Sequence, residues 1–200
     1  EEKNKNLYFN ANIKNYCNSI FCDITNFHLL NKYIEEIDPE IVFHLAAQAL
    51  VRESYENPVH TFETNSLGTL NLLDCLRDQP SVIATVIITS DKCYENVEWL
   101  WGYRENDRLG GKDPYSASKA CAELITKVYM ESFFKEKGPS IATTRAGNVI
   151  GGGDWALDRV VPDCVRAWSK DEKVEIRNPN ATRPWQHVLE PLSGYLALGQ

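Results

Sequence analysis

The sequence lacks long apolar segments and a basic charge balance. Its apolar runs, such as residues 82–88 (VIATVII), fall far short of the about 18 residues that a transmembrane helix needs. The formal net charge is −7, from 21 Lys and Arg against 28 Asp and Glu. A nucleic-acid-binding protein normally presents a basic face. We therefore expect neither a membrane span nor a nucleic-acid partner.

The sequence also lacks the spacings that mark disulfide frameworks and zinc sites. None of the six cysteines forms a C-x-x-C pair, and the four histidines lie far apart. In a chain of 200 residues, scattered cysteines are typical of reduced thiols in a cytoplasmic protein. We expect no bound metal.

Glycine is missing from the first third of the chain, where Gly68 is the first to occur. The glycine-rich loop that opens most dinucleotide-binding folds is therefore absent from this sequence. Later segments must carry any nucleotide-binding signal.

Short apolar runs alternate with amphipathic stretches along the chain. This pattern predicts strands over residues 19–22, 41–46, 82–89, 140–145 and 174–176. It predicts helices over residues 23–38, 57–77 and 113–138, and helices beginning near residues 162 and 186. Asn57 is expected to cap the second helix, with Pro58 at its first position. Alternating strands and helices indicate an α/β fold with a parallel sheet and helices on both faces.

The carboxyl ends of parallel strands lie along one edge, and ligands bind in the crevice outside it. Small or polar residues follow the predicted strands at positions 23–24, 46–48, 89–92 and 145–148. The polar and aromatic loop 91–112 is longer than most connections in compact domains, which also favours a functional role. We expect these segments to outline one site.

Tyr115 and Lys119 are spaced i, i+4 near the start of a predicted helix, so their side chains share a face. A nearby ammonium favours the phenolate, and such a tyrosine can act as a base toward a sugar or alcohol hydroxyl. Chance alone predicts about half of one Y-x-x-x-K in such a chain. The supporting observation is Ser90, which stands at the end of a predicted strand.

These residues resemble the extended short-chain dehydrogenase/reductase family. Ser90, Tyr115 and Lys119 are similar to its catalytic triad, and HLAAQ (residues 44–48) is similar to its second cofactor motif. Asn65 with Gly68 and Thr69 resembles its N-x-x-G-T helix. The resemblance implies a Rossmann-type doubly wound parallel sheet and NAD as cofactor. It also implies that the first strand, the glycine-rich turn and most of a C-terminal substrate domain are absent from the sequence.

Five further motifs resemble the nucleotide-sugar dehydratase branch of that family. They are SDKCYEN (90–96), WGYREND (101–107), DPYSASK (113–119), RAGNVIGGGDWA (145–156) and RPWQHVLEPLSGYL (183–196). Most of the branch carries Asp-Glu after the triad hydroxyl, whereas this chain has Asp91-Lys92, as in the group that acts on CDP-glucose. The expected reaction is dehydration of a nucleotide-activated hexose, CDP-glucose.

The resemblance assigns a role to each catalytic residue. Tyr115 removes the proton of the sugar C4 hydroxyl with the help of Lys119, and Ser90 holds that oxygen. Hydride passes from C4 to NAD, which makes the C5 proton acidic. Asp91 then protonates the departing C6 hydroxyl, while Lys92 stands where related enzymes have a glutamate base. Hydride finally returns to C6.

The resemblance also implies binding residues. The expected cofactor contacts, besides the triad, are Asp23, Ile24, Leu45, Ala46, Ala47, Gln48 and Val149. The expected substrate contacts are Asn148, Arg159 and Arg183, the two arginines on the diphosphate.

Simpler roles compete for three of the singled-out residues. Asp23 is also placed to cap the helix that follows it, and Arg159 could lie on a solvated face. Asn65 is better explained as a residue that bends a helix or ties a loop than as a ligand.

We expect residues 1–160 to form an incomplete NAD-binding domain and residues 161–200 to begin a substrate-binding region. Segments 57–77 and 114–137 resemble a dimer-forming helix pair, so the full-length protein is expected to be a homo-oligomer, a dimer or tetramer. The alternatives are another epimerase or dehydratase of the same family, and a non-catalytic binding module.

Overall fold

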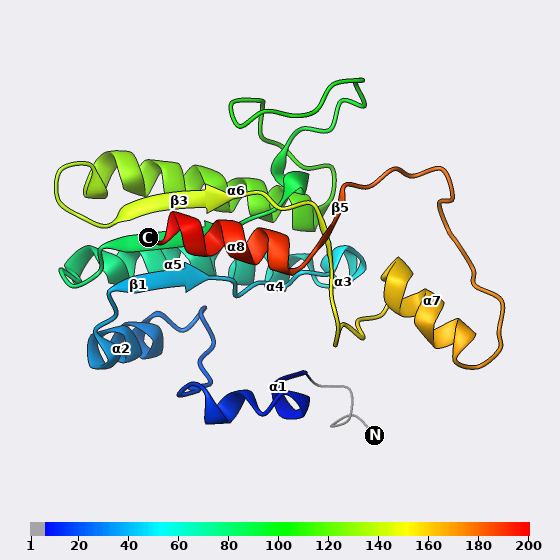
Figure 1. Cartoon of the computed structure of the whole chain (residues 1–200). Helices are drawn as coiled ribbons and strands as arrows, with labels where there is room; N and C mark the ends of the chain where they lie inside the picture. The colour runs from blue at the N-terminus through cyan, green and yellow to red at the C-terminus, as the bar shows by residue number, and fades with distance from the viewer. Residues whose placement is uncertain (1–6) are drawn as a thin grey trace. The chain divides into compact units, whose positions relative to one another are not determined.

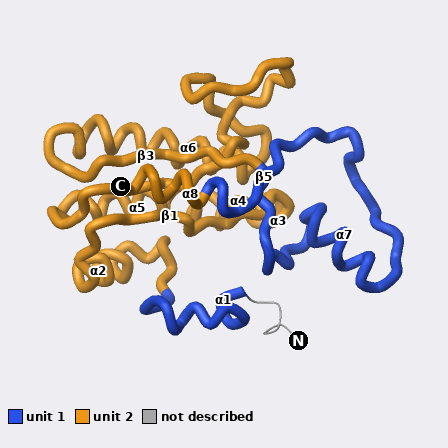
Figure 2. Tube along the Cα trace, viewed as in Figure 1, with its two compact units in different colours: residues 1–21, 148–191 blue, residues 22–147, 192–200 orange. Residues whose placement is uncertain are grey.

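The computed structural model describes residues 7–200 and divides into two compact units (Figure 2). One unit comprises residues 1–21 and 148–191, and the other comprises residues 22–147 and 192–200. The expected division near residue 160 concerns what each part binds, so it stays a prediction.

The larger unit is built on a parallel sheet of three strands (Figure 1). The strands β1 (Ile41–His44), β2 (Ala84–Ile88) and β3 (Ser140–Thr144) lie in the order β1-β2-β3. In the register, His44 is opposite Ile87 and Ile88 is opposite Thr144, so all three strands end along one edge. The predicted α/β parallel sheet is confirmed.

Three helices pack their apolar faces on this sheet and on one another. They are α2 (Phe27–Ile37), α5 (Gly68–Cys75) and α6 (Pro114–Tyr129). The core of buried side chains comprises Ile34, Leu72, Leu73, Cys75, Leu76, Val82, Ile87 and Phe134. Burial of these groups from water is the main term that holds the unit together. The end of α8 (Leu189–Leu198) also belongs to this unit, with Gly199 close against the ring of Phe43 on β1.

The region predicted as one helix, 57–77, is interrupted. It comprises α4 (Pro58–Phe62), a π-helical turn over Glu63–Leu67, α5 and a 3-10 turn over Leu76–Asp78. A further helix, α3 (Val51–Glu56), precedes it and was not predicted. Pro58 occupies the first turn as expected, but the Asn57 side chain donates to Glu53 Oε1 and does not cap the helix.

Helix α6 begins where the sequence predicts. Asp113 accepts hydrogen bonds from Ser116 N at 2.9 Å and from the Ser116 hydroxyl at 2.6 Å, and Pro114 is the first helical residue. The α-helix ends at Tyr129 and continues as a π-helical turn, Met130–Phe134, which stops short of the predicted end at Gly138. The cap places Tyr115 and Lys119 in the first two turns.

Two predicted strands are absent from the described residues. Residues 19–22 form no strand, because no neighbouring strand pairs with them and Phe21 is 90% exposed. Residues 174–176 form none for the same reason, with Ile176 exposed.

The smaller unit holds short elements, of which the sequence predicts one, the helix expected from near residue 162, which begins at Val160. They are α1 (Leu7–Asn10), a 3-10 turn over Ile13–Asn15, β4 (Asn148–Ile150), α7 (Val160–Trp168) and β5 (Trp185–His187). Strands β4 and β5 pair in parallel. No strand was predicted at either place, and β5 lies where the last helix was expected to begin. The last helix therefore begins at Leu189, three residues later than predicted.

Candidate active site

Polar side chains gather where β2 ends and α6 begins. Ser90 follows β2 and is buried, with Asp91 and Lys92 half-buried after it. The Ser90 hydroxyl donates to Asp91 Oδ1 at 3.1 Å and accepts from Lys92 N at 3.3 Å, which closes the 3-10 turn Asp91–Cys93. Asp91 N donates to the carbonyl of Ala146 at 3.1 Å, beyond the end of β3. The hydroxyl and the carboxylate are therefore linked at the sheet edge.

Tyr115 and Lys119 are both buried, one turn apart on α6. The Lys119 ammonium donates to the carbonyl of Ile88 at 3.0 Å, two residues before Ser90. Burial lowers the pKa of Lys119 to about 8, although Cys93 and Glu123 raise it in part. The structure thus brings the lysine of the predicted triad to the strand that carries the predicted serine.

His44, at the end of β1, is a buried histidine whose pKa is affected by Lys119. Burial, followed by the charge of Lys119, lowers the pKa of His44 to about 4. Its Nε2 lies 3.1 Å from the Thr69 hydroxyl, which itself donates to Asn65 O at 2.7 Å. Because the hydroxyl proton is used, Nε2 carries the imidazole proton and donates.

Asn65 ties a loop, as one interpretation of the sequence holds. Its Oδ1 accepts from Gln48 N at 2.8 Å, and its Nδ2 donates to Gln48 O at 3.0 Å and to Ser118 Oγ at 2.9 Å. The residue is 1% exposed and lies in the π-helical turn. It therefore joins the segment after β1 to α6.

The expected cofactor segment after β1 has small or exposed residues. Leu45 and Ala46 are exposed and Ala47 is half-buried. The Gln48 side chain already has protein partners, since it bonds to the backbone of Leu50 and to Thr61 Oγ1 on α4. A contact of Gln48 with a cofactor would use other atoms of that residue. The expected cofactor contacts of Leu45, Ala46, Ala47 and Gln48 stay predictions.

Asp23 does not cap the following helix. Its Oδ1 accepts from Thr25 N at 2.9 Å and from the Thr25 hydroxyl at 2.8 Å, and these bonds lower the pKa of Asp23. Asn26 caps α2 instead. Ile24 lies so close to Gly68 that a Cβ on that glycine would come within 2.5 Å of the isoleucine side chain. The expected adenine contacts of Asp23 and Ile24 stay predictions.

Four expected ligand residues lie in the smaller unit. Asn148 and Val149 belong to β4, and Arg183 is exposed with a bond from its Nη1 to Thr182 O at 2.8 Å. Arg159 precedes α7 and pairs with Asp154 at 3.3 Å. Their expected ligand contacts also stay predictions.

A buried ion pair that was not predicted from the sequence lies beneath the site. Glu123, one turn after Lys119 on α6, accepts two hydrogen bonds from Arg145, which follows β3, and another from Thr89. The available signal was the i, i+4 spacing of Lys119 and Glu123, but a polar residue at that spacing is equally typical of a solvated helix face.

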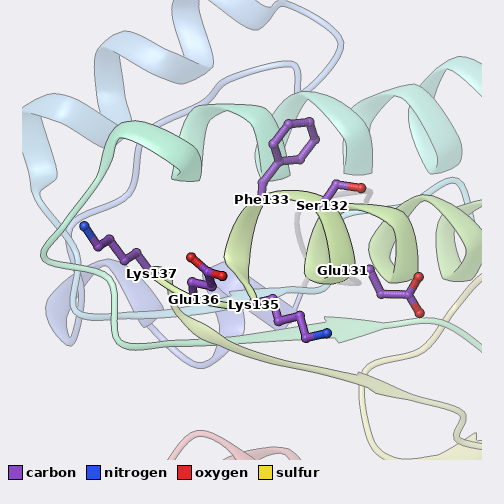
Figure 3. Close-up of a pocket in the computed structure, with 6 residues that line it drawn as sticks. All are labelled: Glu131, Ser132, Phe133, Lys135, Glu136 and Lys137. Carbon is purple, nitrogen blue, oxygen red and sulfur yellow. The ribbon is translucent and has the colours of Figure 1, made fainter.

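A hollow at the far end of α6 is not part of this site (Figure 3). It is lined by Glu131, Ser132, Phe133, Lys135, Glu136 and Lys137. These side chains point in different directions (Figure 3). The hollow begins at Glu131, roughly 18 Å along the helix from Lys119 at about 1.5 Å per residue. Nothing converges there on a ligand.

The described residues show neither a metal site nor a membrane span. Over residues 7–200, no three His, Cys, Asp or Glu side chains are grouped so as to hold a metal ion. None of the helices in that range combines the length and apolarity required to cross a bilayer.

Comparison with known proteins finds similar chains among named nucleotide-sugar enzymes. It is 55% identical over 183 residues to the CDP-glucose 4,6-dehydratase of Salmonella typhimurium, a match to 89% of this chain and 51% of that protein. It is 27% identical over 188 residues to the CDP-paratose 2-epimerase of Salmonella typhi, with 86% and 53% covered. The chain spans about half the length of these curated relatives.

A solved structure extends the likeness to the fold. The dTDP-glucose 4,6-dehydratase DesIV of Streptomyces venezuelae, solved as a double mutant with NAD bound, superposes with a TM-score of 0.79 at 25% identity. The match covers 90% of this chain and 53% of that one. The family model described as GDP-mannose 4,6 dehydratase matches residues 2–198, nearly the whole sequence. The chain therefore belongs to the GDP-mannose 4,6-dehydratase family.

Proposed function

We propose that the full-length protein catalyses the dehydration of CDP-glucose to CDP-4-keto-6-deoxyglucose. The observation that carries this proposal is the 55% identity to the Salmonella CDP-glucose 4,6-dehydratase. The pair Asp91-Lys92 after Ser90 supports the same substrate, because it resembles the pair of the group that acts on CDP-glucose, where most of the branch has Asp-Glu.

The proposed cofactor is NAD, which when bound supplies the hydride acceptor and donor for the reaction. A similar dehydratase was solved with NAD bound. The chemistry of the residues after β1 fits such a group, because the short side chains of Ala46 and Ala47 allow its close approach. The exposed carboxylate of Asp23 offers a hydrogen-bond acceptor for the adenine amino group. We assign the nicotinamide side to Val149, in the smaller unit.

The first proposed step is deprotonation of the sugar C4 hydroxyl by Tyr115. Lys119, whose pKa burial lowers to about 8, is still largely an ammonium at neutral pH and favours the phenolate. Ser90 holds the C4 oxygen, for which its hydroxyl must turn from Asp91 toward the substrate. The step needs no other proton acceptor.

The second proposed step is loss of water across C5 and C6. Asp91 donates a proton to the departing C6 hydroxyl, and Lys92, which stands where related enzymes have a glutamate base, is assigned to the C5 proton. The two residues are adjacent in one 3-10 turn. Asn148, Arg159 and Arg183 are assigned to the substrate, the arginines to its diphosphate.

We also propose that the full-length protein works in the cytoplasm as a homo-oligomer. All six cysteines are free thiols, in keeping with a reducing compartment. Leu124, Val128 and Phe133 are about half exposed along α6 and the turn that continues it, which supports a helix-mediated contact. Light scattering on the full-length protein tests this assembly.

Replacement of Tyr115 by Phe tests the proposed function. The variant lacks the base, so conversion of CDP-glucose by the full-length protein should fall at least about 100-fold. The matched control is Tyr129→Phe, which removes the other tyrosine hydroxyl of α6, one that bonds to Asp74 at 3.2 Å. That control should retain wild-type turnover.

Two results would contradict the proposal. One is turnover of Tyr115→Phe within a few-fold of the wild type. The other is a wild-type enzyme that dehydrates dTDP-glucose or GDP-mannose but leaves CDP-glucose unchanged, because this outcome reassigns the substrate within the family.

A further inference from the structure

A buried charge cluster joins α6 to the carboxyl ends of β2 and β3. Glu123 is 5% exposed and lies one turn after Lys119. Its Oε1 accepts from Arg145 Nε at 2.8 Å and from the Thr89 hydroxyl at 2.5 Å. Its Oε2 accepts from Arg145 Nη2 and from the Thr143 hydroxyl, both at 2.9 Å. One guanidinium fork thus bridges both oxygens of the carboxylate.

The Glu123–Arg145 pair is charged despite its burial. Burial by itself raises the pKa of Glu123, but the bonds from Arg145 and the two threonines outweigh it and lower that pKa. The bonds that Arg145 donates to Glu123 raise the pKa of Arg145 against the effect of burial. Loss of one partner would leave the other charge buried without compensation.

Arg145 also holds the long loop that follows the Ser90 segment. Its Nη1 donates to the carbonyl of Glu105 at 2.9 Å, and its guanidinium carbon lies 4.8 Å from the centroid of the Tyr94 ring. Tyr94 comes directly after the turn Asp91–Cys93 and forms an antiparallel bridge with Leu109. One side chain therefore ties α6 to two points of the loop, Tyr94 and Glu105.

Thr89 connects the cluster to Ser90, the next residue. Its hydroxyl shares one proton between Glu123 Oε1 and the carbonyl of Thr144, which lies at 2.8 Å. Its backbone N–H donates to the same carbonyl at 2.9 Å. The point where β2 ends is thereby fixed relative to both β3 and α6.

We propose that Glu123 and Arg145 are positioning residues for the active site. The pair holds the end of β2 against α6, so that Ser90 and Tyr115 meet the same substrate oxygen. Apolar residues of similar volume commonly stabilise a core as well as a buried ion pair does. We therefore assign to this pair the positioning of β2 and α6 rather than added stability. The proposal rests on the proposed function, because it assigns these residues a role at the same site.

The variant Glu123→Gln in the full-length enzyme tests this role. It keeps the size of the side chain and one acceptor oxygen but removes the charge that orients Arg145. Well below the melting temperature, kcat should fall at least about 10-fold, because small displacements of catalytic groups are costly. KM for CDP-glucose should change by less than about three-fold, since the substrate contacts remain.

Two further variants complete the comparison. Glu131→Gln removes an exposed carboxylate from the turn that continues α6, one that pairs with Lys127 at 4.0 Å, and it should leave kcat and KM unchanged. Thr143→Val removes only the hydrogen bond that the Thr143 hydroxyl donates to Glu123. This variant tests the positioning role if Glu123→Gln does not fold. We expect kcat of Thr143→Val to fall about three-fold at constant KM.

A lower melting temperature with wild-type kcat, in whichever variant folds, would show a purely structural role and overturn the proposal. A wild-type enzyme without CDP-glucose turnover would overturn the proposed function instead. The positioning role would then be judged by amide hydrogen exchange of residues 89–94, which Glu123→Gln or Thr143→Val must accelerate relative to β1. Equal exchange in wild type and variant would overturn it.

Discussion

Two buried basic side chains near the Ser90 segment, Lys119 and His44, have pKa values below their ordinary ones. Burial is the first cause of the lowered pKa in both, and the charge of Lys119 lowers that of His44 further. His44 is thus kept neutral beside a lysine that remains largely charged at neutral pH. Of these two basic side chains, Lys119 alone therefore carries a positive charge at neutral pH.

This difference makes stability depend on pH. The pKa of His44 is about 4 in the folded chain and about 6.5 in an unfolded one, so the unfolded state binds the extra proton between these values. Acidification from pH 7.5 to pH 5 should therefore cost about 2 kcal/mol of unfolding free energy through His44 alone. The cost is absent above pH 7, where both states are neutral.

Denaturant titrations of wild type and His44→Gln measure this contribution. Other groups also titrate over the range, so the informative quantity is the difference between the two slopes against pH. The free energy of unfolding of the wild type should fall more steeply as pH decreases. Parallel curves for the two proteins would mean that His44 is protonated in the folded state.

Residues whose role depends on local spacing could be predicted from the sequence. Tyr115 and Lys119 share a helix face, and Ser90 ends an apolar run, so a linear pattern suffices. Glu123 and Arg145 pair across two elements, and neither has a local feature that separates it from a solvated charge. Their pairing required the fold.

At the scale of elements, the most informative departure is the π-helical turn at Glu63–Leu67. The spacing of apolar residues predicts a continuous helix there. A single wider turn changes that spacing too little to be recognised in the sequence. The turn carries Asn65, whose three bonds reach Gln48 and Ser118. Such bulges are frequent at functional sites, and this one fixes the segment after β1.

Removal of the Asn65 side chain should therefore destabilise the protein. Asn65→Ala leaves polar groups of Gln48 and Ser118 without their partner, and we expect a loss of about 3 kcal/mol in the free energy of unfolding. Asn31→Ala, which removes an exposed bond to Glu35 on α2, should change it by less than about 0.5 kcal/mol. Denaturant unfolding compares the two variants. Equal losses of unfolding free energy would contradict the stabilising role of the Asn65 hydrogen bonds.

Elements with strong patterns were predicted well, and short or unpaired ones were not. The core strands β1, β2 and β3 and the capped start of α6 lie where the sequence places them. Strands β4 and β5 have three residues each, too few for a period to show. Residues 19–22 have strand-like composition, but a strand also needs a neighbour to supply hydrogen bonds.

At the scale of the molecule, the parallel sheet and the family are consistent with one another. The sheet edge gathers Ser90, Lys119 and His44 in the larger unit, while the expected diphosphate ligands Arg159 and Arg183 belong to the smaller one. The chain covers about half of its curated relatives, so the proposed reaction is a property of the full-length protein.

Isotope transfer in the full-length enzyme tests the central claim most directly. CDP-glucose carrying deuterium at C4 is incubated with the enzyme and NAD, and the position of the label is read by NMR. We expect a product that has lost one water and carries the deuterium at C6, because the hydride taken from C4 returns there. Deuterium that remains at C4 of an intact hexose, as an epimerase or an inactive protein would leave it, would contradict the account.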